Sequence, residues 1–271
     1  MSCAGLLRRE LSDRAQQYAR ERGLPYSLSY GQPPTVCFEC NEGARHGNFM
    51  PAVYTAILRK ANWRRRLQKV HSQGRKSLPR NERGVWRELD ACTSSDALLM
   101  NVFCYPGVFK DGRVASLLGL NSAENPDFGF RARVRLANGR LDRTEVDMRL
   151  GDLLVEAKLT ESDFQRVPKK RLSEYKDFDV VFDCEALPQT EREYLSYQLI
   201  RNVLAAFAGN CSFCVIADAR RPELVEAWYV VMKCVKPVEL RPRCKVLSWQ
   251  ELAKVLPARQ RLFLHEKYGI G

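Results

Sequence analysis

Two neighbouring segments with alternating polarity, residues 143–150 and 153–159, constrain the fold of this chain more than any other feature. Alternation with a period of two is typical of β-strands, and the Gly151-Asp152 pair between the segments is typical of a tight turn. The sequence therefore predicts a β-hairpin. One face of this hairpin is expected to be apolar, with Val146, Met148, Leu150, Leu153, Val155, Ala157 and Leu159.

The other face of the predicted hairpin carries two carboxylates and a lysine. Asp147 lies in the first strand, and Glu156 and Lys158 lie two positions apart in the second, so all three are expected to point the same way. Phosphodiester hydrolysis needs an activated water and a neutralised phosphoryl charge, and a hard cation held by oxygen ligands can supply both. These residue types therefore favour a metal-dependent phosphodiesterase site.

In this interpretation Asp147 and Glu156 hold Mg²⁺ or Mn²⁺, and the carbonyl of Ala157 is a third ligand. Lys158 orients the attacking water or stabilises the developing negative charge, and we expect partial burial to lower its pKa enough for proton transfer. An ordinary ion pair on a half-exposed sheet is the alternative. A second acid-x-Lys pattern, Glu174-Tyr175-Lys176, has no apolar strand under it and is expected to be solvated surface.

The run from Asp147 to Phe164 resembles the PD-(D/E)xK nuclease superfamily, which has the restriction-endonuclease-like fold. Upstream, residues 94–97 (Ser-Ser-Asp-Ala) resemble a helix segment of a bacterial branch of restriction-endonuclease-like proteins in which Ser-Ser-Gln-Ala is usual, and here Asp96 stands in place of the Gln. Downstream, residues 194–203 resemble the helix that follows the catalytic strands. The resemblance covers roughly residues 82 to 256.

This resemblance implies two further site residues. In the superfamily a Gln or Tyr of the later helix often supports the site, which makes Gln198 a candidate. The first helix often lends a further acid to the metal, and Glu88 is the candidate, with a surface carboxylate as the alternative.

Periodicity and turn residues give a compatible order of elements. We predict a basic, mainly helical N-terminal extension over residues 1–80 and a nuclease core over 81–271, of mixed α/β (α+β) class with the order αβββαβ. The predicted helices are 5–22, 50–70, 84–104, 191–207, 222–232 and 250–255, and the predicted strands are 130–136, 143–150, 153–159, 212–217 and 245–249.

The charge of the chain favours a nucleic-acid partner. The formal net charge is +12 with a pI near 9.3, and residues 59–83 carry ten cations against one acid. Such a block attracts a phosphate backbone by counterion release, although a solvated helix face or a basic linker is the alternative. Trp63 within it could stack on a base, but an aromatic residue on a helix is more often part of the packing.

Ten cysteines without a secretory signal predict reduced thiols in a cytoplasmic protein. Cys37-Phe-Glu-Cys40 with His46, and Cys211-Ser-Phe-Cys214, have spacings seen at zinc sites, but incidental thiols are the simpler interpretation. No apolar run predicts a membrane span, none of the three histidines lies beside a plausible nucleophile, and no P-loop is present.

The sequence therefore predicts a Mg²⁺-dependent nuclease that acts on DNA. Two other classes remain open: a nucleic-acid-binding protein of the same fold with little or no catalysis, and a zinc-stabilised interaction protein. Because many enzymes of this fold cut two strands as dimers, a homodimer is a further expectation.

Overall fold

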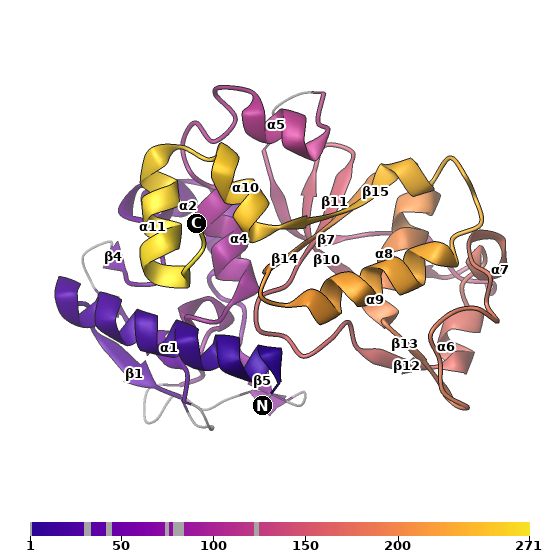
Figure 1. The fold of residues 1–271 in the computed structure, drawn as a ribbon, viewed down its shortest axis with the longest axis horizontal. Helices are drawn as coiled ribbons and strands as arrows, with labels where there is room; N and C mark the ends of the chain where they lie inside the picture. The colour runs from indigo at the N-terminus through magenta and orange to yellow at the C-terminus, as the bar shows by residue number, and fades with distance from the viewer. Residues whose placement is uncertain (1, 30–33, 42–44, 74–75, 78–83, 122–124) are drawn as a thin grey trace. The chain divides into compact units, whose positions relative to one another are not determined.

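The computed structural model describes residues 2–29, 34–41, 45–73, 76–77, 84–121 and 125–271 (Figure 1). The chain forms two compact units: Met1–Asn121 together with Trp249–Gly271, and Ser122–Ser248. The second unit is thus inserted into the first. The division expected near residue 80 does not coincide with the boundaries of these units. None of the helices in the described ranges is long and apolar enough to cross a membrane.

The first unit is mainly helical. Its helices are α1 (Cys3–Arg22), α2 (Pro51–Arg59), α3 (Ala61–Arg66), a 3-10 helix (Glu88–Asp90), α4 (Ser95–Phe103), α5 (Arg113–Leu118), α10 (Trp249–Val255) and α11 (Ala258–Tyr268). Its short strands are β1 (Tyr26–Leu28), β2 (Val36–Phe38), β3 (Cys40–Asn41), β4 (Arg45–His46), β5 (Ser72–Gln73) and β6 (Lys76–Ser77).

Two predicted helices of this unit are shorter than expected. The helix predicted over 50–70 is interrupted at Lys60, whose backbone is extended (φ −110°, ψ 116°), so that α2 and α3 are separate. The helix predicted over 84–104 begins only at Ser95. Ser94 is its N-cap and accepts a hydrogen bond from the Ala97 N–H, and Arg87 upstream pairs with Val70 in an isolated β-bridge.

The second unit contains an open five-stranded mixed sheet with the strand order β15-β14-β11-β10-β7. These strands are β7 (Asp127–Arg131), β10 (Glu145–Leu150), β11 (Leu153–Ala157), β14 (Ser212–Ala217) and β15 (Cys244–Ser248). The β10 strand runs antiparallel to both of its neighbours, whereas β11, β14 and β15 run parallel to one another. This sheet and its helices confirm the predicted mixed α/β fold of the restriction-endonuclease-like type.

The predicted hairpin is confirmed. Met148 pairs with Val155 and Leu150 with Leu153 across the turn, in which Gly151 has a left-handed backbone (φ 60°). The β10 strand alternates between exposed and buried positions, as expected for a strand with one solvated face. All of β11 is buried because it lies inside the sheet with β10 and β14 on either side.

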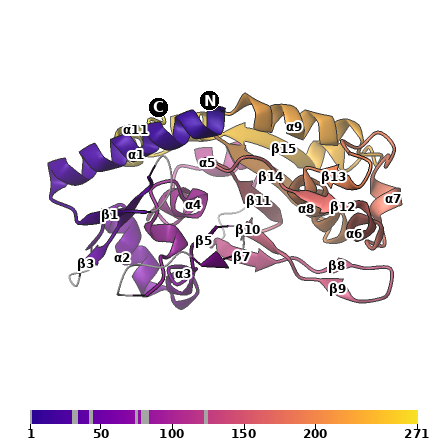
Figure 2. The same ribbon diagram turned by 90° about the horizontal axis from the view of Figure 1, so that it is seen from below.

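The strand predicted over 130–136 forms part of a longer ribbon. It consists of β7 and the short β8 (Val134–Arg135), and β8 pairs with β9 (Leu141–Asp142), which lies before the strand predicted over 143–150 and was not predicted. The β8–β9 pairing has the same register as the β7–β10 pairing, so residues 127–136 run continuously beside 140–149. Figure 2 shows this hairpin extending from β7 and β10 away from the rest of the sheet.

Helices α8 (Tyr197–Ala208) and α9 (Pro222–Lys233) pack in one hydrophobic core with the sheet. The predicted start of the first helix at 191 is wrong, because β13 (Glu193–Leu195) precedes α8 and pairs with β12 (Arg166–Pro168). Four later predictions are confirmed, with bounds that agree within one or two residues: the strands 212–217 and 245–249 and the helices 222–232 and 250–255. The remaining elements are α6 (Lys169–Ser173), α7 (Phe178–Val181) and a 3-10 helix (Arg241–Arg243).

The second acid-x-Lys pattern is only partly solvated surface. Lys176 is exposed and Glu174 half-buried, but Tyr175 is buried in the core with α8. Its hydroxyl donates to Asp142 Oδ2 at 2.6 Å. Tyr175 is therefore covered by packing against α8, which the local sequence pattern does not reveal.

Candidate active site

The turn between β10 and β11 brings Asp147 beside the Glu156-Ala157-Lys158 segment. Asp147 lies one residue beyond the Met148–Val155 pair, so the register places it opposite Glu156. Its carboxylate oxygen Oδ2 accepts a hydrogen bond from the Ala157 N–H at 2.8 Å. The two predicted carboxylates therefore lie on neighbouring strands at the same level of the sheet.

Lys158 completes this arrangement from the end of β11. Its Nζ lies 2.9 Å from Glu156 Oε1 and donates a hydrogen bond to Gln198 Oε1, also at 2.9 Å. Glu156 and Lys158 are only 2% and 4% exposed. Gln198 comes from the first turn of α8. The structure thus brings together all four residues that the sequence analysis proposed as catalytic.

The sequence analysis expected burial to lower the pKa of Lys158, but in the structure this pKa is raised. Burial does lower the pKa of this ammonium group, but the carboxylates of Glu156, Glu161 and Asp147 together raise it above the ordinary value. Lys158 is therefore protonated at neutral pH. The charged form of Lys158 is thus favoured by the three carboxylates around it.

Asn202 is a site residue that the sequence analysis did not identify. Its side-chain Nδ2 donates to Glu156 Oε2 at 2.9 Å, and its Oδ1 accepts a hydrogen bond from Arg201. Because Asn202 follows Gln198 by four residues, both amides lie on the same face of α8. The four-residue spacing from Gln198 could have identified Asn202 in the sequence. One face of the helix carries the partner of Lys158 and the partner of Glu156.

The segment after Lys158 is held by a second buried arginine that the sequence did not reveal. Arg221 is fully buried and donates to the carbonyls of Leu159 at 2.9 Å and Glu161 at 2.6 Å. Glu161 Oε2 in turn accepts the Leu159 N–H at 2.6 Å. These bonds fix the backbone that leaves β11 and place a third carboxylate near Lys158.

The donor set of this site fits a hard divalent cation. Three carboxylates surround one ammonium group, which leaves net negative charge. Glu156 Oε1 is buried, and its 2.9 Å contact with Lys158 lacks hydrogen-bond geometry, so no described residue donates a well-formed hydrogen bond to it. Across the described ranges, no group of three or more His, Cys, Asp or Glu side chains is arranged to hold a metal. A cation here would need backbone oxygen and water as further ligands.

Glu88 belongs to the first compact unit and lies there in a cluster of charges. Its carboxylate is 2.9 Å from Lys69, which also contacts the buried Asp96 at 2.7 Å, and Arg66 contacts Asp96 at 2.8 Å. Burial raises the pKa of Glu88 to about 7, with Lys69 opposing and Asp96 adding to the shift. A role for Glu88 as a metal ligand stays a prediction.

The basic block at 59–83 is only partly described. Trp63 is 4% exposed, with Lys60 Nζ at 3.8 Å from the centre of its ring, which supports the packing interpretation over base stacking. Arg66 and Lys69 are engaged with Asp96. Three of its cations lie outside the described residues: Arg75, Arg80 and Arg83.

Among the side chains that the structure describes, no group of cysteines and histidines converges as a zinc site would require. Both ring nitrogens of His46 are engaged, Nε2 with Asp90 at 3.0 Å and Nδ1 with the Asn48 N–H at 3.1 Å. The thiols of Cys211 and Cys214 donate to separate backbone carbonyls. None of the nine cysteines whose side chains are described forms a disulfide, and the side chain of Cys40 lies outside the described residues.

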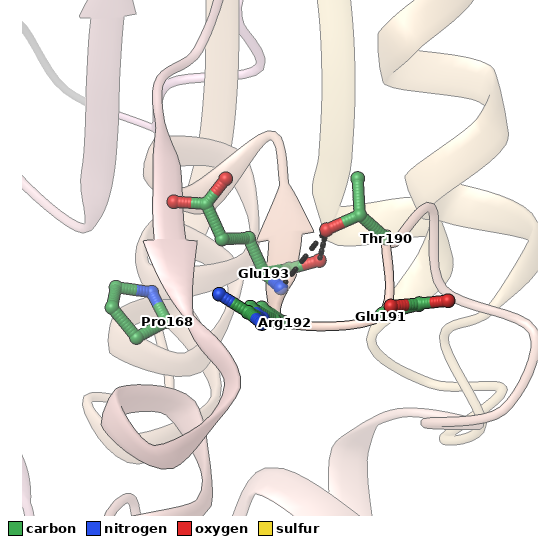
Figure 3. A pocket seen from close by; sticks show the side chains of 5 residues that line it. All are labelled: Pro168, Thr190, Glu191, Arg192 and Glu193. Atoms are coloured by element: carbon green, nitrogen blue, oxygen red, sulfur yellow. Dashed lines mark hydrogen bonds between the residues drawn. The ribbon is translucent and has the colours of Figure 1, made fainter.

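A surface pocket of about 620 Å³ lies elsewhere in the second unit (Figure 3). Thr190 forms its wall with Glu193, whose N–H donates to the Thr190 hydroxyl at 3.0 Å. None of the four predicted catalytic residues lines this pocket. Its lining residues are Pro168, Thr190, Glu191, Arg192 and Glu193.

Comparison with known proteins identifies a family. The family model described as "Restriction Endonuclease associating with ARP" matches residues 13–269, a range that includes the whole candidate site. No curated protein and no solved structure matches the chain. The match confirms the resemblance to restriction-endonuclease-like proteins and suggests a nuclease. The chain belongs to the family of restriction endonucleases associating with ARP.

Proposed function

We propose that this protein is a Mg²⁺-dependent deoxyribonuclease that hydrolyses DNA phosphodiester bonds at the site formed by Asp147, Glu156 and Lys158. The observation that carries the proposal is the convergence of these residues at the end of one hairpin, with Gln198 beside them. Membership in a restriction endonuclease family implies DNA as the substrate.

Asp147 and Glu156 would hold the metal, with the Ala157 carbonyl as a further ligand. When bound, Mg²⁺ supplies a Lewis acid for the phosphoryl oxygen and lowers the pKa of a coordinated water. Mn²⁺ has the same preference for oxygen ligands and is expected to substitute. The two carboxylates carry the charge that this cation must balance.

The side chains around the carboxylates keep the site in one geometry. Gln198 fixes the Lys158 ammonium by accepting one of its protons, and Asn202 fixes the Glu156 carboxylate by donating to it. Lys158 then presents a positive charge in a water-poor environment, where it stabilises negative charge on the phosphoryl group most effectively. Without a metal, the carboxylates of Glu156, Glu161 and Asp147 raise the pKa of Lys158, which favours its charged form.

The test is cleavage of supercoiled plasmid and of single-stranded DNA with Mg²⁺ or Mn²⁺, beside an EDTA control. Asp147→Asn, Glu156→Gln and Lys158→Ala are each expected to lower the rate at least about a hundredfold, because each removes a charge from the site. The first two keep side-chain volume and an acceptor oxygen, so folding is retained. Glu174→Gln and Lys176→Met, from the other acid-x-Lys pattern, are the matched controls and are expected to cleave normally.

Cleavage that survives Asp147→Asn or Glu156→Gln contradicts the assignment of these residues. If the wild-type protein binds DNA in a salt-sensitive manner and never cuts it, the alternative of a binding protein with this fold replaces the nuclease.

A further inference from the structure

The ribbon that extends from β7 and β10 carries a concentration of arginine that the site does not use. Residues 131–143 read Arg-Ala-Arg-Val-Arg-Leu-Ala-Asn-Gly-Arg-Leu-Asp-Arg and contain five arginines and one acid. All five arginines are exposed. They are named here the arginine ribbon: Arg131, Arg133, Arg135, Arg140 and Arg143.

The positive charge of the arginine ribbon is not neutralised within the described structure. Its one acid, Asp142, is buried and accepts hydrogen bonds from Thr144 and Tyr175. Among the described residues, none forms an ion pair or side-chain hydrogen bond with any of the five guanidinium groups. By contrast, Arg201 and Arg221 in the same unit are buried and fully engaged with backbone carbonyls. Arginines left exposed in this number are suited to an external anionic partner.

The ribbon presents these charges in a regular array. Ala132, Val134 and Leu136 pack in the core with α8, so the arginines at the alternate positions 131, 133 and 135 point away from it. The shared register places Arg133 opposite Arg143 on the neighbouring strand. Alternate residues along a strand are about 7 Å apart, and paired strands are about 5 Å apart. Arg140 lies opposite Leu136, on the face that packs in the core, and the exposed Glu145 lies opposite Arg131. The array on the exposed face therefore consists of Arg131, Arg133, Arg135 and Arg143.

The array is connected directly to the candidate active site. Arg143 precedes Asp147 by four residues along the β9–β10 segment, a separation of roughly 13 Å. Arg201 of α8 holds the ribbon at its base by donating to the carbonyls of Thr144 at 2.6 Å and Glu145 at 2.9 Å. The same helix carries Asn202 and Gln198, which contact Glu156 and Lys158. The ribbon and the site are therefore held by one helix.

We propose that the exposed face of the arginine ribbon binds the phosphate backbone of duplex DNA beside the cleavage site. This proposal rests on the proposed function for the choice of DNA. The choice of duplex comes from the residues: 131–143 contain no aromatic side chain, whereas proteins that bind single strands stack bases on aromatic rings. Two-stranded ribbons also match the dimensions of a duplex groove.

The proposal adds a second DNA contact to the one expected at the basic block 59–83, in which Arg59, Arg64 and Arg65 are exposed. In that block Arg66 and Lys69 are engaged with buried Asp96, and Lys69 also contacts Glu88. Cations that already have carboxylate partners release fewer counterions on binding DNA. The arginine ribbon has no such internal partners in the described part of the chain, so its charges contribute fully.

The experiment measures binding of the full-length protein to a short labelled duplex in EDTA, at several salt concentrations. The variant is Arg133→Gln with Arg143→Gln, which removes one cross-strand pair. The matched control is Arg166→Gln with Arg192→Gln, which removes two exposed arginines from the β12–β13 ribbon of the same unit. We expect the variant to lose affinity on the order of 10- to 60-fold near 0.1 M salt and its salt slope to fall by about two. The control is expected to bind like the wild type.

Equal affinities of the variant and the control overturn the proposal, and so does a wild-type protein that does not bind duplex in EDTA. An equal loss on single-stranded DNA overturns duplex as the partner. Cleavage is assayed separately. If duplex binding depends on Arg133 and Arg143 but no DNA is cut, this inference stands and the proposed nuclease activity is wrong. If DNA is cut but the variant binds duplex as tightly as the wild type, the nuclease activity stands and this inference is wrong.

Discussion

At the residue scale, the geometry of the site depends on amide side chains as much as on charged ones. Asn202 donates to one oxygen of Glu156 while Lys158 contacts the other, so the carboxylate has a single orientation. Asn202→Ala leaves Glu156 free to rotate and removes the acceptor for Arg201. We expect this change to lower the cleavage rate at a fixed Mg²⁺ concentration about 10- to 100-fold, the usual cost of losing a residue that orients a metal ligand.

The readout that separates orientation from general destabilisation is the Mg²⁺ dependence of the rate. If Asn202 orients Glu156, more Mg²⁺ is needed for half-maximal cleavage by the variant, whereas partial unfolding lowers the maximal rate alone. Asn121→Ala, at an exposed position outside both the site and the arginine ribbon, is the control. An unchanged Mg²⁺ requirement in Asn202→Ala contradicts the orienting role.

The sequence was sufficient to predict which residues meet, but not how their charges balance. Asp147, Glu156 and Lys158 converge because strand periodicity and a two-residue turn determine faces locally. The direction of the Lys158 pKa shift depends on how many carboxylates surround it, and Glu161 reaches it only through a turn held by Arg221. Asn202 was missed because its partner lies across a helix–sheet contact.

At the element scale, local signals predicted the sheet well and the helix ends poorly. The hairpin, the buried strand 212–217 and the helix after Pro222 have strong local patterns and are confirmed. The helix predicted over 84–104 failed because its apolar spacing also suits a segment that enters a β-bridge before Ser94 caps the real helix. The strand β9 was not predicted because it is only two residues long, too short for a pattern of alternating polarity.

The charge cluster that links α3, the 3-10 helix and α4 gives a prediction about pH. The pKa of Glu88 is about 7 in the folded protein and 4.5 in an unstructured chain. The folded state therefore retains a proton that the unfolded state loses, and the contribution of Glu88 to the free energy of unfolding decreases as pH rises from 4.5 to about 7. Within this window the free energy of unfolding falls by at most about 1.4 kcal/mol for each pH unit.

Glu88→Gln keeps the neutral form and nearly the same volume, so its stability should depend less on pH within that window. Urea unfolding of both proteins across the window is the measurement, and the difference in midpoint should shift in favour of the variant as pH rises. Glu174→Gln, at a half-exposed site in the second unit, is the control. Parallel stability curves for wild type and Glu88→Gln would show that the folded carboxyl is already ionised.

At the scale of the whole molecule, the insertion of one unit into the other determines how the ends of the chain contribute. The first unit is completed by residues after Ser248, which lie far away in the sequence. Gln260 in α11 donates to the backbone carbonyls of Asn101 and Val102, and the buried Lys267 donates to the Gly47 carbonyl at 2.8 Å. The predicted boundary near residue 80 followed the start of the family resemblance at about residue 82, and a local resemblance carries no information about such long-range contacts.

Truncation after Ser248 tests this dependence. It removes α10 and α11, and with them the partners of Asn101 and Gly47, so α1 and α4 lose part of their buried contacts. Amide hydrogen exchange in α1 and α4 should accelerate on the order of a hundredfold or more, equivalent to about 3 kcal/mol of local stability. Exchange in β11 and β14 should change little, because the second unit retains its own sheet and core. Leu262→Ala, at an exposed position of α11, is the control for α11 itself. Equal acceleration in both units would instead show that the two unfold as one cooperative block, and that the five-stranded sheet needs the C-terminal helices to be stable.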